Sequence, residues 1–102
     1  MATIYEPVTV GSTFVWQGQF LGDSGVPISN LNGYTVTIEF IDPTGASSGL
    51  LAATVTDNSN AIAKYTNLPA LFNIAGTWTR RWKAVNGNTV LRADKISFLV
   101  EP

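Results

Sequence analysis

The sequence predicts an all-β protein, a single immunoglobulin-like antiparallel β-sandwich of about seven strands. Three observations support this prediction. Thr, Val and Ile, which favour strands, together supply over a quarter of the 102 residues. Apolar and polar side chains alternate with a period of two in four separate runs. Short segments rich in Gly, Asn, Asp and Pro separate the runs, as expected for strands joined by turns in a domain of about 100 residues.

The four strongest strands are expected at residues 14–20, 34–40, 77–84 and 95–101. Each run places its apolar side chains on one face and its polar side chains on the other. A strand of this kind covers a core with one side and meets solvent with the other. The apolar faces are Phe14, Trp16 and Phe20; Tyr34, Val36, Ile38 and Phe40; Trp78, Trp82 and Ala84; and Ile96, Phe98 and Val100.

Weaker strands are expected at residues 8–10, 51–56 and 61–66, which brings the total to seven. The sequence shows no internal repeat, linker or second domain. We therefore expect residues 8–102 to form the β-sandwich, and residues 1–7 to form an N-terminal arm or an edge strand.

Two connections carry local signals. Asn86-Gly87, between two alternating runs, is the clearest hairpin signal in the chain. Residues 68–74 do not alternate, and we expect one short helical turn at residues 69–73. In that arrangement Leu71 or Phe72 closes one end of the sandwich.

The composition excludes several classes of function. Without His or Cys, the chain has no imidazole base, no thiolate nucleophile, no usual zinc site and no disulfide. The six basic and seven acidic residues are scattered, so there is no basic patch for nucleic acid. No segment is apolar enough to span a membrane, and the N-terminus lacks the pattern of a secretory signal.

The acidic residues point to turns rather than to catalysis. Asp23, Asp42 and Asp57 stand in turn sequences, where an aspartate accepts hydrogen bonds from the backbone that follows it. Glu39 lies on the polar face of its strand. Neither a pair of catalytic carboxylates nor a dense calcium loop is evident. The sequence therefore predicts no enzymatic activity, no cofactor and no metal site.

Trp78, Arg80 and Trp82 occupy successive positions on one face of the same strand. Positions in the core are favoured, because both indoles share this face with other apolar residues. A guanidinium among them must then reach an edge or stack on the rings. The alternative is a partly uncovered face that binds a partner or, together with Trp16, stacks against sugar rings.

Apolar residues on the polar sides of the strands indicate contact with another chain. Such residues mean little singly, but together they suggest a covered outer surface. They are Val15, Leu21, Ile41, Val85 and Leu99. The expected contact residues are Ile4 and Tyr5 in the N-terminal arm and Leu31, Leu71 and Phe72 in loops.

Several motifs together resemble a known class of domain. They are GSTF (11–14), GVPI (25–28) and LNGYTV (31–36), followed by AGTW (75–78), Arg81-Trp82 and ISFLV (96–100). This order is similar to that of small immunoglobulin-like domains in structural proteins of tailed bacteriophages. The resemblance spans residues 8–100.

The resemblance implies a non-enzymatic virion protein that binds other phage structural proteins. Such domains decorate or cement capsids, act as neck or tail adaptors, or precede baseplate and fibre proteins. Because the chain ends two residues after Val100, the last apolar position of its final strand, we expect a decoration, cement or adaptor protein. We also expect it to form a homo-oligomer or symmetric array in the virion after synthesis in the host cytoplasm. The alternative is a carbohydrate-binding module that aids adsorption to the host surface, which requires at least two exposed, roughly coplanar aromatic rings.

Overall fold

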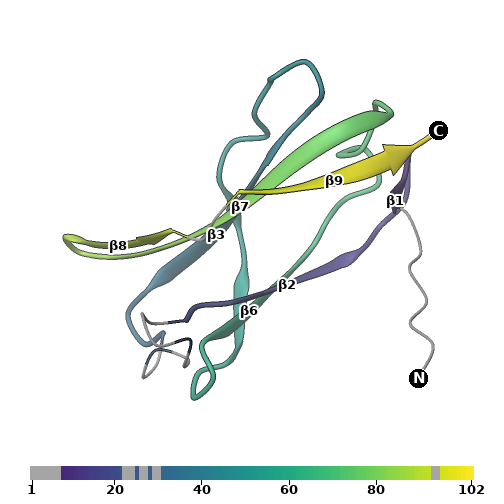
Figure 1. Cartoon of the computed structure of the whole chain (residues 1–102). Coiled ribbons are helices and arrows are strands. Elements are labelled where there is room, and N and C mark those ends of the chain that lie inside the picture. Colours follow the sequence, from purple (N-terminus) through teal and green to yellow (C-terminus); the bar gives the residue numbers. More distant parts are fainter. Residues whose placement is uncertain (1–7, 22–24, 26–27, 29–30, 93–94) are drawn as a thin grey trace.

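The computed structural model describes residues 8–21, 25, 28, 31–92 and 95–102, and these form nine β-strands and no helix (Figure 1). The strands belong to two sheets, so the prediction of an all-β sandwich is confirmed. They are β1 (Val8–Thr9), β2 (Val15–Gln19), β3 (Thr35–Ile41), β4 (Leu51–Ala52), β5 (Thr54–Asp57), β6 (Ile62–Thr66), β7 (Gly76–Asn86), β8 (Thr89–Arg92) and β9 (Ile96–Glu101).

The larger sheet has six strands in the order β1-β9-β7-β3-β4, and β8 also pairs with β7. The smaller sheet has the order β2-β6-β5. In Figure 1 the ribbons of β9, β7 and β3 lie above those of β2 and β6. This is the arrangement of the immunoglobulin fold, in which strands C, F and G face strands B, E and D. One pair differs from the antiparallel expectation, because β1 runs parallel to β9 with Val8 opposite Val100.

Strand β7 organises the larger sheet. One edge pairs with β3 from Thr79 opposite Ile41 to Val85 opposite Thr35. The other edge is shared, since β9 pairs with the first half of β7 and β8 with its second half. The predicted hairpin is present, with Gly87 at a φ of +58° in the turn. Its second strand is β8, however, which was absent from the expected strands.

Two other expectations were wrong. Residues 51–56 were expected to form one strand, but β4 pairs with β3 in one sheet and β5 with β6 in the other. The chain changes sheets at Ala53, whose N–H donates to the carbonyl of Val36 at 2.9 Å. Residues 69–73 form no helical turn; the N–H of Leu71 instead closes a reverse turn on the carbonyl of Leu68 at 3.0 Å.

The core is aromatic at its centre. Phe72, which was expected to close one end of the sandwich, is fully buried. Its ring meets Trp78 and Phe40 edge-on, at centroid distances of 5.1 and 5.4 Å. Gly18 on β2 makes room for another ring, because a Cβ there would lie 2.6 Å from Cε2 of Trp82. The close approach of Trp82 therefore explains the glycine within the apolar face of this strand.

Candidate interaction surface

Asn67 is the buried polar side chain of the core, with 1% of its surface exposed. Its Oδ1 accepts hydrogen bonds from the Phe14 N–H at 2.9 Å and from Nε1 of Trp16 at 3.1 Å. Its Nδ2 donates to the carbonyls of Ser12 at 2.9 Å and Leu68 at 3.0 Å. These four bonds use both donors and both lone pairs of the amide. Asn67 thus joins the chain before β2 to the chain after β6, and its role is structural.

Arg80 emerges from the same core on β7. Its guanidinium carbon lies 5.2 Å from the ring centroid of Trp16 and 6.0 Å from that of Phe98. The expected stacking of this cation on aromatic rings is therefore confirmed, although the rings are not those of Trp78 and Trp82. Burial lowers the pKa of Arg80, but an arginine remains protonated in a protein. Its Nε is buried and has no hydrogen-bond partner among the residues that the structure describes.

Trp78 and Trp82, the candidate ligand face, are both buried in the core. The Nε1 of Trp78 donates to the carbonyl of Ile74 at 2.9 Å, which satisfies the polar end of that indole. The ring of Trp82 covers Gly18. Neither indole presents a face to solvent, so the two do not form a stacking platform.

The expected contact residues fall in different environments. Leu31 and Phe72 belong to the core, so their assignment to a contact surface was wrong. Both stand in loops, but each loop turns its apolar side chain inward. Leu71 is half-buried. Ile4 and Tyr5 lie outside the described residues.

The aspartates that the structure describes stabilise turns, as expected. Oδ1 of Asp42 accepts hydrogen bonds from the N–H and Oγ1 of Thr44 at 2.8 and 2.6 Å, and from the Ala46 N–H at 3.0 Å. The bond from the Thr44 hydroxyl is the main cause that lowers the pKa of Asp42. Asp57 accepts two hydrogen bonds from Asn60, whose side-chain amide chiefly lowers the pKa of Asp57. Asp23 lies outside the described residues.

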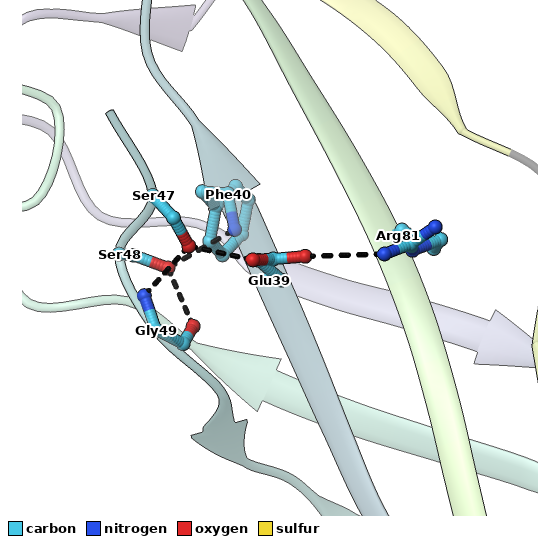
Figure 2. A network of polar contacts seen from close by, with 6 residues as sticks. All are labelled: Glu39, Phe40, Ser47, Ser48, Gly49 and Arg81. Carbon is cyan, nitrogen blue, oxygen red and sulfur yellow. Dashed lines mark hydrogen bonds and ion pairs between the residues drawn. The ribbon is translucent and has the colours of Figure 1, made fainter. Parts of the chain in front are cut away.

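Glu39 takes part in a polar network that fastens the loop after β3 (Figure 2). Its Oε2 accepts a hydrogen bond from Ser47 at 2.6 Å, and its Oε1 lies 3.5 Å from Nη2 of Arg81. Ser48 Oγ accepts from the Phe40 N–H at 3.0 Å and donates to the carbonyl of Gly49 at 2.9 Å. Each polar group in this network has a local partner, so its role is structural.

Several apolar side chains are exposed, in part as expected. Val15, Leu21 and Leu99 were expected on the outer surface and are exposed, whereas Ile41 and Val85 are half-buried. The sequence did not single out the other large apolar side chains that the structure shows to be exposed. They are Val10, Leu50, Leu68, Ile74, Val90 and Ile96.

Three of these side chains line one groove. Leu21 just beyond β2, Val90 in β8 and Ile96 in β9 are 52%, 45% and 48% exposed. The groove has a volume of about 590 Å³, and we call it the β8 groove. Its lining consists of Gln19, Phe20, Leu21, Ile28, Val90, Leu91, Arg92 and Ile96.

The β8 groove adjoins an unpaired strand edge. Strand β8 pairs with β7 and with no other strand of the described chain. The backbone groups along its other edge are thus available to a further strand. Apolar side chains beside free backbone donors and acceptors suit the binding of another protein segment.

The structure offers little for other kinds of site. Among the described residues, no three acidic side chains gather in a group that could hold a metal ion. Within the same residues, no helix has the length and apolar character of a membrane span.

Comparisons of the chain with protein-family models, with curated proteins and with solved structures find no match.

Proposed function

We propose that this protein is a non-enzymatic structural component of a bacteriophage virion. It decorates or cements the capsid, or acts as a small neck or tail adaptor, through contacts with other virion proteins. The observation that supports this proposal most directly is the β8 groove, where exposed Leu21, Val90 and Ile96 adjoin a strand edge that pairs with no described strand. The motifs that resemble phage immunoglobulin-like domains supply the choice of partner.

The groove provides the energy of a protein–protein contact. Full burial of one large apolar side chain stabilises by about 1.5–3 kcal/mol. Three such side chains therefore contribute several kcal/mol, much of which offsets the lost freedom of the bound partner. A single contact of this kind is weak. Repetition over a symmetric lattice or ring raises the total affinity, because all copies on the assembly act together.

The composition of the groove fits protein binding better than catalysis. Arg92 is the one charged residue among the described residues that line it, and none of those residues carries a carboxylate. General acid–base chemistry needs a titratable group within hydrogen-bond reach of a substrate, and arginine does not titrate near neutral pH.

The carbohydrate-binding alternative has no comparable support. It requires at least two exposed aromatic rings, and every described aromatic side chain is buried or half-buried. Trp16 is half-buried and packs at a tilt against Phe98, with ring centroids 4.9 Å apart.

The proposal is tested on purified virions. We expect the protein in stoichiometric, symmetry-related copies, located by mass spectrometry and by cryo-electron microscopy of the particle. Val90→Asp introduces a charge into the groove and is expected to reduce incorporation at least tenfold. Leu50→Asp is the matched control, because Leu50 is exposed outside the groove and is expected to tolerate a charge. Absence of the protein from virions contradicts the proposal, and equal incorporation of both variants contradicts the role of the groove.

A further inference from the structure

Residues 80–95 concentrate the positive charge of the chain. They hold five of the six basic residues and one acidic residue, Asp94, and so carry a net charge of +4. The rest of the chain holds one basic and six acidic residues, a net charge of −5. The segment comprises most of β7, the hairpin turn and β8, and it ends just before β9. The charge of the molecule is therefore unevenly distributed, although its total is only −1.

Two of these cations lie directly opposite each other in the larger sheet. Lys83 in β7 pairs with Arg92 in β8. Lys83 alternates with Trp82 and Ala84, which are buried in the core, so Lys83 and Arg92 point to the outer face of the sheet. Lys83 is half-buried and Arg92 is exposed. Like charges in this arrangement destabilise a sheet.

The described residues supply no carboxylate to this pair. Among them the single ion pair joins Glu39 to Arg81, at 3.5 Å, and it includes neither Lys83 nor Arg92. Asp94 lies outside the described residues. A carboxylate from another chain would form charge-assisted hydrogen bonds with both cations and remove the cost of their repulsion. The pair therefore suits an acidic partner.

We propose that β8 binds an acidic, extended segment of another protein, which adds a strand to the sheet and places carboxylates beside Lys83 and Arg92. Within the described chain, β8 pairs only with β7, so its second edge has no described partner. Side chains of an added strand alternate between the two faces of the sheet. Those on the outer face meet Arg92, and those on the inner face cover Leu91 and Ile96 of the β8 groove. The partner segment thus alternates acidic and apolar residues.

The charges also discriminate against other occupants of this edge. Pairing of β8 with the β8 of a second copy would gather both copies of Lys83 and Arg92 on one face, where their repulsion opposes association. Nucleic acid would satisfy the cations, but its phosphates would leave the exposed Val90 uncovered. An alternating acidic and apolar strand compensates the charges and covers the apolar side chains together. The inference rests on the proposed function in one respect, namely that the β8 groove binds another protein.

Urea unfolding of the free protein tests whether the two cations lack a partner within the chain. Arg92→Gln and Arg92→Lys both lose the guanidinium, and only the first loses the charge. We expect the midpoint of Arg92→Gln to be the higher one at low ionic strength, because repulsion from Lys83 is relieved. The two midpoints should converge at high salt, which screens exposed charges. A higher midpoint for Arg92→Lys at low salt shows that a carboxylate of the same chain already compensates the charge, and equal midpoints at all salt concentrations show no repulsion. Either result overturns the inference.

Nuclear magnetic resonance of the full chain tests the partner. The probe is a short peptide in which glutamate and valine alternate, and we expect it to shift the amide signals of β8. Lys83→Gln together with Arg92→Gln should raise the Kd of the probe about threefold or more. The control is Lys64→Gln, which removes the one basic residue outside residues 80–95, an exposed side chain in β6, and should leave the Kd unchanged.

Three results of this titration overturn the inference. They are no binding of the probe, equal binding of a peptide with lysine in place of glutamate, and binding of a short DNA duplex at β8 as tight as that of the probe. The proposed function is decided separately, on virions. If Lys83→Gln with Arg92→Gln enters virions as efficiently as Lys64→Gln, the proposed function stands and the acidic partner is overturned.

Discussion

Trp16 meets two polar side chains that the fold treats differently. Nε1 of its indole donates to Oδ1 of Asn67 at 3.1 Å, while its ring lies under the guanidinium of Arg80 at 5.2 Å. Asn67 is buried with four hydrogen bonds. Arg80 is half-buried, and its buried Nε has no hydrogen-bond partner in the described part of the chain.

The difference follows from the number of groups that each side chain must satisfy. An amide has two donors and two lone pairs, and four fixed backbone or indole groups match them. A guanidinium has five donors and a full charge, which a core of aromatic rings does not match. The amide of Asn67 is therefore fully buried, where it joins the chain before β2 to the chain after β6. The guanidinium of Arg80 instead reaches an edge and stacks on the rings.

The largest loss of stability is expected when Asn67 is replaced. Asn67→Ala leaves the Phe14 N–H and Nε1 of Trp16 buried without an acceptor, at about 1–3 kcal/mol for each group. We expect the free energy of unfolding to fall by about 3–5 kcal/mol, measured by urea denaturation. The control is Asn88→Ala, which removes an exposed amide from the turn after β7. Equal loss in the two variants would contradict the role of Asn67.

The next largest loss of stability is expected at Gly18 in β2, the strand that carries Trp16. In Gly18→Ala the new methyl group would lie 2.6 Å from Trp82, so the ring or the strand must move. Overpacking of this kind costs about 1–3 kcal/mol. Gln17→Ala, an exposed position on the same strand, is expected to change stability little. Thermal unfolding followed by circular dichroism measures both, and a Gly18→Ala protein as stable as the wild type would refute this packing.

A smaller loss of stability is expected when Arg80 is replaced. Arg80→Lys keeps the charge but loses the planar group that stacks on Trp16 and Phe98. We expect a loss of about 0.5–1 kcal/mol in urea denaturation. Arg92→Lys is the matched control, because Arg92 is exposed. Identical unfolding curves for Arg80→Lys and the wild type would show that stacking contributes nothing.

The smallest loss of stability is expected at Asp42, a half-buried side chain in the turn after β3. Its hydrogen bonds hold its pKa below the ordinary 3.8. A depressed carboxyl pKa adds stability above the unfolded-state value, and that stability is lost as the pH falls through the folded-state pKa. We therefore expect Asp42→Asn to flatten the dependence of the unfolding midpoint on pH below about 4. Glu101→Gln is the control, and a wild-type slope in Asp42→Asn would contradict the assignment.

The features of the fold that could be predicted from the sequence are those that leave a pattern in neighbouring residues. The alternation of apolar and polar side chains identified the long strands. The position of Arg80 on an apolar face predicted that its guanidinium would stack on aromatic rings or reach an edge. The strand β8 was missed because its four residues contain only two apolar side chains, Val90 and Leu91. The change of sheet at Ala53 was missed because it depends on which strands lie nearby.

The candidate site was harder to predict because its residues meet only in the folded chain. Asn67 follows a predicted strand and resembles a turn residue, yet Phe14, Trp16 and Ser12, three of its four partners, lie more than fifty positions away. Ile96 shares the apolar face of its strand, so its exposure depends on what covers β9. Loop position misled the assignment of Leu31 and Phe72, because a loop can direct an apolar side chain into the core.

The parallel pairing of β1 with β9 has a mechanical consequence. Val8 pairs with Val100 and Thr9 with Glu101, and both strands run in the same direction. A force that separates the two ends of the described chain therefore slides one strand along the other. The interstrand hydrogen bonds lie across this direction and share the load, whereas bonds at the end of a hairpin break one at a time. The geometry thus favours resistance to tension along the line that joins the two ends.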